Sequence, residues 1–89
     1  MEKENRPVEM ISVCSADGGL LPVRFRYEDA THQIQIAHIR EIVCVKEACY
    51  VGVEVLFYVC KARIEGQEHL LELKYMVKTH RWMLFRVIY

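Results

Sequence analysis

Alternation of apolar and charged side chains over short segments is the feature that most constrains the fold of this chain. In residues 22–27, apolar side chains alternate with Arg24 and Arg26, which is the period of a half-buried β-strand. The stretch 81–89 is mostly apolar and again mixes arginine with aromatic residues, among them Trp82 and Phe85. Both segments predict strands, and we expect the second one to close the sheet.

Turn sequences separate further segments of the same kind. Asp17-Gly18-Gly19 supplies residues that accept a positive φ and predicts a hairpin. Other polar turns are expected at 28–32, 65–68 and 78–80. Strands at this spacing, bounded by turn signals, are typical of small barrels. We therefore predict an all-β fold in which about six antiparallel strands form a meander and a small, partly closed barrel.

Residues 38–48 leave two alternatives open. Ile39 and Ile42 fit one face of a helix, which would give an α+β fold with a helix near 38–48. The β-branched content of the segment instead favours a strand with a bulge near Arg40.

The chain is short enough to form one domain over residues 1–89. Residues 1–7 are charged and end in a proline, so we expect a flexible lead-in there. The sequence has neither an apolar run long enough to cross a membrane nor the apolar core of a signal peptide. We therefore expect a cytoplasmic protein without a membrane partner, in which the four cysteines are reduced thiols.

The sequence argues against most catalytic chemistry. Gly18-Gly19 lacks the surroundings of a phosphate-binding loop, and neither Ser12 nor Ser15 lies in a nucleophile motif. We predict a non-enzymatic protein with no catalytic, cofactor-binding or metal-binding residues. A metal-binding or enzymatic protein is the remaining alternative, through a half zinc site at Cys44 and Cys49 or a pairing of Cys49 with His38.

Charge is balanced overall but uneven along the chain. Twelve basic residues match twelve acidic ones, yet residues 73–89 contain four bases and no acid. If the first and last strands lie side by side, a local basic surface results. Its candidate members are Arg24, Arg26, Lys74, Lys78, Arg81 and Arg86. We expect Arg86 to share the side of Trp82 and Leu84, since they alternate along one segment.

Two functions follow from these patterns. Residues 53–60 are apolar on both faces, and leftover apolar surface on a small domain favours association. The first prediction is therefore a β-module that binds another protein or a second copy of itself. The alternative is a nucleic-acid-binding accessory domain that uses the basic surface, although the spacing of Phe25 and Trp82 predicts core residues rather than stacking platforms.

Several segments resemble a small, uncharacterised bacterial domain. Residues 23–27 (Val-Arg-Phe-Arg-Tyr) and 57–61 (Phe-Tyr-Val-Cys-Lys) are similar to two of its strands, and residues 71–74 and 81–87 to its ending. A related domain forms the C-terminus of ImuB-type, Y-family-polymerase-like subunits of bacterial mutagenic repair. The family's Trp-rich middle segment is replaced here by residues 49–52 (Cys-Tyr-Val-Gly). The resemblance implies a non-catalytic accessory module near DNA repair and supplies no catalytic residues.

Overall fold

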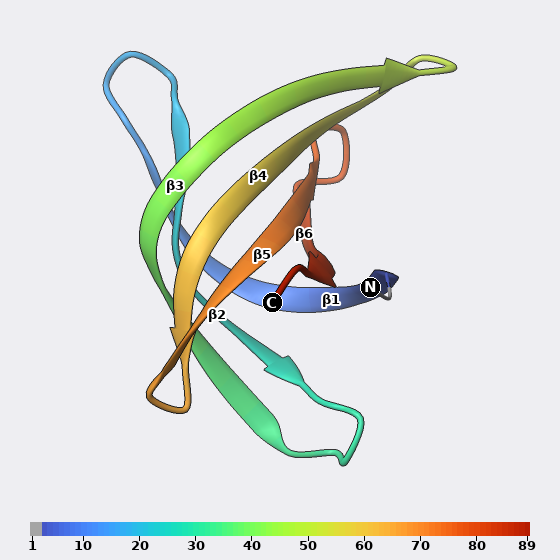
Figure 1. The fold of residues 1–89 in the computed structure, drawn as a ribbon. Helices are drawn as coiled ribbons and strands as arrows, with labels where there is room; N and C mark the ends of the chain where they lie inside the picture. Colours follow the sequence, from blue (N-terminus) through green and yellow to red (C-terminus); the bar gives the residue numbers. More distant parts are fainter. Residues whose placement is uncertain (1–2) are drawn as a thin grey trace.

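The chain folds into a six-stranded antiparallel barrel (Figure 1). The structure, a computed structural model, describes residues 3–89, and their side chains from residue 5 onward. The strands are β1 (Lys3–Cys14), β2 (Leu20–Glu28), β3 (Ile34–Tyr50), β4 (Val53–Ile64), β5 (Gln67–Met76) and β6 (Arg81–Val87). Each strand pairs with the next, and β6 pairs with β1. The predicted all-β meander is confirmed, and the alternative helix near 38–48 is wrong because β3 spans it.

The alternating side chains that predicted the strands also build the core. Phe25 on β2, Leu71 and Leu73 on β5, and Leu84 on β6 are fully buried inside the barrel. Trp82 is buried as well, so both aromatic residues expected in the core lie there. Burial of this kind is the main favourable contribution to folding.

Three aromatic rings fill one end of this core. The Trp82 ring lies 5.2 Å from that of Tyr58 and 4.7 Å from that of Tyr75, measured between centroids. The rings are tilted against one another at angles near 50°, which is one of the arrangements that aromatic pairs favour. The cluster therefore ties β4, β5 and β6 together from inside.

β3 is long and bent, and two β-bulges account for the bend (Figure 1). The register against β4 shifts between Ile39 and Glu41 and again between Ile42 and Cys44. The extra residues are thus Arg40 and Val43, and the predicted bulge near Arg40 is confirmed. A bulge bends its strand and increases the local twist, so β3 curves around the barrel and then continues beyond it.

The flexible lead-in expected over residues 1–7 is wrong for residues 3–7, which are part of β1. β1 begins at Lys3, and its ladder with β6 includes the pair of Lys3 with Arg86. The register shifts between Lys3 and Arg6, where Asn5 has a φ of 46°. Residues 3–7 belong to the sheet because the edge of β6 offers backbone hydrogen-bond partners, which local charge composition does not reveal. Residues 1–2 lie outside the described residues.

Candidate protein-interaction site

One margin of β3 has no strand beside it. The β2–β3 ladder begins at Glu28 with Ile34 and ends at Arg24 with His38, whereas the β3–β4 ladder continues to Tyr50. Within residues 3–89, no other strand pairs with this side of β3 beyond His38. We call residues 39–50 the open edge. In Figure 1 the β1–β2 hairpin and the β3–β4 hairpin diverge where the open edge begins.

The sequence of β2 explains why its ladder with β3 stops. Ile11 pairs with Arg24 and Ser12 with Pro22, so Val23 is an extra residue that bulges from β2. Pro22 has no N–H to donate to a neighbouring strand. The bulge at Val23 and the adjacent Pro22 therefore end the pairing of β2 with β3, and the bulge at Arg40 bends β3 at the same place.

Tyr58 connects the two diverging strands from the inside of the barrel. Its hydroxyl donates a hydrogen bond of 2.7 Å to the backbone carbonyl of Leu20, at the start of β2. Tyr58 belongs to β4, so the bond passes from β4 to β2 without β3. Burial raises the pKa of the Tyr58 hydroxyl, which keeps it protonated as a donor. The separation of β2 from β3 is thus held by a specific contact.

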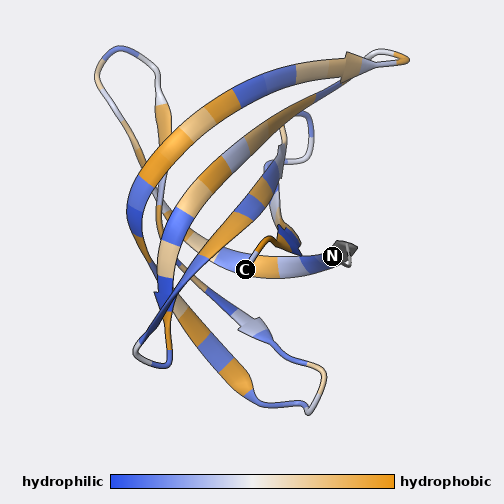
Figure 2. Cartoon of the chain, in the orientation of Figure 1, coloured by the Kyte–Doolittle hydropathy of each residue, from blue (hydrophilic) through white to orange (hydrophobic). Residues whose placement is uncertain are grey.

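Apolar side chains are exposed along the open edge. Val43 and Val45 are each 48% exposed, and Leu21 and Val23 on the diverging part of β2 are exposed as well. Coloured by hydropathy, β3 shows apolar bands between polar ones along its whole length (Figure 2). Unpaired backbone groups next to exposed β-branched side chains are the features that allow another strand to pair.

The tip of the β3–β4 hairpin is apolar too. Tyr50 is 81% exposed and Val51 86% exposed, although polar residues are usual at such tips. A cavity of about 610 Å³ lies near this end of the open edge. Its lining combines the carboxylates of Glu47 and Glu54 with apolar residues such as Leu56. This lining suits a cationic group on an apolar stem.

The predicted basic residues fall into two groups. Arg24 and Arg26 lie on β2, and the Arg26 guanidinium is paired with both carboxylate oxygens of Glu9 on β1, at 3.1 and 3.0 Å. Lys74 lies on β5, Lys78 in the turn after it, and Arg81 and Arg86 on β6. Because β1 lies between β2 and β6 in the barrel, the sheet does not set the two groups on adjacent strands.

The second group contains its own acid. Arg86 donates from Nε to Glu72 at 2.7 Å, and the side chain of Glu72 is only 10% exposed. Lys74 lies 5.7 Å from the centre of the Phe85 ring, a cation–π distance. These contacts engage two of the cations in this group with partners on neighbouring strands.

Arg86 does not share the side of Trp82 and Leu84, which corrects the sequence-based expectation. In the β5–β6 ladder Leu73 pairs with Leu84 but Glu72 pairs with Arg86, so Phe85 is an extra residue. A bulge of one residue reverses the alternation that follows it. Trp82 and Leu84 therefore point into the core, whereas Arg86 meets Glu72.

The cysteines and histidines do not come together as a reactive centre. Cys49 and His38 lie on the same strand, with His38 just before the open edge and Cys49 near its other end. At about 3.3 Å per residue, they are far beyond hydrogen-bond reach. Across the part of the chain that the structure describes, no group of three or more His, Cys, Asp and Glu could hold a metal ion. Burial raises the pKa of the Cys60 thiol to about 12, while the other three cysteines are exposed.

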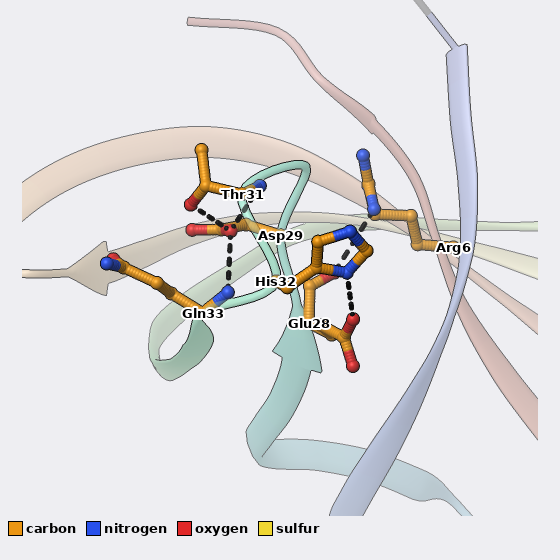
Figure 3. A network of polar contacts seen from close by, with 6 residues as sticks. All are labelled: Arg6, Glu28, Asp29, Thr31, His32 and Gln33. Carbon is orange, nitrogen blue, oxygen red and sulfur yellow. Dashed lines mark hydrogen bonds and ion pairs between the residues drawn. The ribbon is translucent and has the colours of Figure 1, made fainter.

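A polar network at the β2–β3 turn shapes the turn itself (Figure 3). The Asp29 carboxylate accepts hydrogen bonds from the Gln35 side chain and from Thr31, which hold its pKa well below the usual range. Arg6 donates to the backbone carbonyl of Glu28 at 3.1 Å. These contacts lie within the β2–β3 connection or reach it from β1, so they order the turn that precedes β3.

Comparison of the chain with protein-family models, with curated proteins and with solved structures gives no match. The resemblance of residues 22–87 to the small bacterial domain therefore stays a prediction. None of the described residues forms a helix with the length and hydropathy needed to cross a membrane. What the fold defines is a meander barrel in which one long strand has an unpaired apolar margin.

Proposed function

We propose that the chain is a non-enzymatic β-module that binds another protein by strand addition at the open edge. The observation that supports this function is the margin of β3 over residues 39–50, which no other described strand covers. In strand addition, main-chain hydrogen bonds supply affinity and alternate side chains supply specificity. The open edge offers both, since the backbone groups on the margin away from β4 are unpaired and Val43 and Val45 are half exposed beside them.

Two further features support this function. The exposed Tyr50 and Val51 extend the apolar surface past the end of the ladder, so a bound strand would find side-chain contacts beyond the backbone pairing. All four cysteines are free thiols, which suits the reducing cytoplasm that we propose as the location.

Nucleic-acid binding stays a prediction of the sequence, as does the link to DNA repair. Its direct test is titration with a single-stranded oligonucleotide at low salt, where attraction between cations and phosphates is strongest. We rank it second because Arg26 and Arg86 have carboxylate partners and because Phe25 and Trp82 are buried away from any base.

Selection of binders from a library of displayed short peptides tests strand addition without a known partner. We expect selected peptides to be extended, with alternating apolar residues, and to slow hydrogen exchange of the amides in residues 39–50. The double variant Val43→Lys/Val45→Lys should lose this binding, since lysine on an edge discourages pairing. The matched control is Ile34→Lys/Ile36→Lys, on exposed positions of β3 that already face β2.

The proposal is wrong if no peptide is selected. It is also wrong if the selected peptides protect other residues, or if both double variants bind them equally well.

A further inference from the structure

We propose that the strand added at the open edge is β3 of a second copy of this chain, paired antiparallel over residues 40–47. This inference rests on the proposed function, because it names the partner of the same edge. The segment reads Arg-Glu-Ile-Val-Cys-Val-Lys-Glu. When it is set antiparallel against itself about a two-fold axis between Val43 and Cys44, each charged residue meets one of opposite sign and each apolar residue meets another apolar one or a cysteine.

This register gives four kinds of residue pair across the interface between the two copies. Arg40 lies opposite Glu47 of the second copy, Glu41 opposite Lys46, Ile42 opposite Val45, and Val43 opposite Cys44. The two-fold axis repeats every pair, as a closed homodimer requires. Opposite charges and apolar pairs across antiparallel strands stabilise the pairing, whereas like charges destabilise it.

The two pairs Glu41–Lys46 and Ile42–Val45 also match in the face of the sheet that they occupy. Residues directly opposite each other in an antiparallel pair point to the same side. Ile42 and Val45 pair across the β3–β4 ladder with Cys60 and Tyr58, which are buried, so both lie on the inner face of the sheet, where Val45 is still half exposed.

Glu41 and Lys46 point to the outer face instead. Their partners across the ladder are Lys61 and Phe57, and Phe57 contacts Phe85 there. The charged pair and the apolar pair thus agree in face as well as in chemistry.

Neighbouring registers fit worse. A shift by two residues in one direction sets Ile42 against Glu47, and a shift in the other direction sets Val45 against Arg40. Each shift sets charged side chains against aliphatic ones and separates the pairs of opposite charge, so the stabilising cross-strand contacts are lost. Because the axis passes beside Val43, the bulge there is common to both strands and does not displace one against the other.

The groups that this pairing needs are available. Arg40, Glu41, Lys46 and Glu47 are all exposed. Glu41 approaches Lys61 only at 3.7 Å, and both side chains are exposed, so this ion pair is weak.

Charge reversal followed by sedimentation analysis tests the register. Wild-type protein should dimerise with rising concentration, and more weakly as salt is raised. Lys46→Glu and Glu41→Lys should each weaken dimerisation more than about tenfold, because like charges then meet at two symmetry-related positions. An equimolar mixture of the two variants should form heterodimers, and Glu41→Lys/Lys46→Glu in one chain should restore the homodimer. Lys78→Glu, an exposed reversal in the β5–β6 turn, is the matched control and should dimerise like the wild type.

A short bis-maleimide crosslinker gives an independent readout. The two Cys44 residues would flank the axis at roughly 6 Å between Cα atoms, given the spacing of paired strands and the rise per residue. Crosslinked dimer should form in the wild type and in Cys49→Ser, and it should be lost in Cys44→Ser.

A wild type that stays monomeric at every concentration overturns the inference, as does a dimer that Lys46→Glu leaves intact. If the wild type is monomeric but selected peptides still protect residues 39–50, self-pairing is wrong and strand addition stands. If neither occurs, both proposals are wrong.

Discussion

The Tyr58 hydroxyl supplies a hydrogen bond to β2 that neighbouring strands supply elsewhere in the barrel. It satisfies the carbonyl of Leu20 at the point where β2 has left β3. Tyr58→Phe removes this donor and leaves a carbonyl to be satisfied by water, so we expect a loss of about 1–3 kcal/mol in the free energy of unfolding. Urea denaturation measures the change.

The control for this variant is Tyr50→Phe, because Tyr50 is exposed at the hairpin tip. Its unfolding free energy should stay close to that of the wild type. Equal stability of the two variants would show that water replaces the Tyr58 hydroxyl without cost, and that the bond does not hold β2 in place.

Cys60 should be the one thiol that resists modification in the folded protein. Burial raises its pKa to about 12, whereas Cys14, Cys44 and Cys49 are exposed. Only the thiolate reacts, so a colorimetric thiol reagent near pH 8 should titrate three thiols in native protein and four in urea. Fast reaction of a fourth thiol without denaturant would contradict the burial of Cys60.

The same thiol makes stability depend on pH above the ordinary cysteine pKa of 9.0. Between that value and about 12, the unfolded chain loses a proton that the folded chain retains. The folded state then binds more protons, so its stability falls as pH rises through this window and is unaffected by Cys60 below it. Cys60→Ala should remove this component of the pH dependence.

Among the connecting elements, the β3–β4 turn carries local strain. Val51 has a φ of 51° and Gly52 a φ of 79°, and a two-residue turn with both angles positive is a type I′ turn. A β-branched residue is disfavoured in this conformation, by about 1–2 kcal/mol. Val51→Asn should therefore stabilise the protein by about 1 kcal/mol, since Asn-Gly is the preferred sequence.

Glu65-Gly66 provides the comparison, because the β4–β5 turn has nearly the same angles, 51° and 76°. Glu65→Asn should stabilise less than Val51→Asn, since glutamate is not β-branched. Chemical denaturation of both variants checks the order. If Val51→Asn gains nothing, contacts of the valine compensate for its backbone conformation.

Strand positions followed from the sequence, and the bulge near Arg40 did as well, because β-branched residues and broken alternation mark such sites. The open edge did not follow. Alternation predicts which face a side chain takes but not how far two strands stay paired. The ladder ends where Val23 bulges next to Pro22, and the consequence appears on β3, far along the chain.

The basic residues illustrate the same limit. Their side chains could be counted from the sequence, but their grouping depends on strand order. β1 separates β2 from β6 and brings Glu9 to Arg26, and the bulge at Phe85 turns Arg86 toward Glu72. No sequence pattern within residues 81–87 indicates that β1 lies between β2 and β6 or that Phe85 forms a bulge.

For the whole molecule, the β1–β6 ladder, which we call the seam, joins the two strands that are farthest apart in the sequence. Pro7 lies opposite Met83 across it, and opposite residues on paired strands have a spacing that suits a disulfide. Pro7→Cys/Met83→Cys, made in a background where the exposed cysteines are serine, would close a loop of about 75 residues and stabilise the protein by about 4 kcal/mol. Unfolding with and without reductant measures the gain.

The matched control disulfide joins positions 63 and 68, since Arg63 and Glu68 are opposite each other near the β4–β5 turn. Arg63→Cys/Glu68→Cys closes a loop of only about six residues and should gain about 2 kcal/mol. If the two disulfides stabilise the protein equally, β1 and β6 are already in contact in the unfolded chain.

The meander order also predicts the order in which the strands pair during folding. Every strand from β1 to β5 pairs with the one that follows it, whereas β6 must find β1 across the whole chain. Loops this long are entropically costly to close before contacts form, so the hairpins should assemble first and the seam last. Substitutions at the seam should then speed unfolding and leave the folding rate unchanged. During translation, the sheet would stay open, with the β6-facing side of β1 unpaired, until β6 has been synthesised.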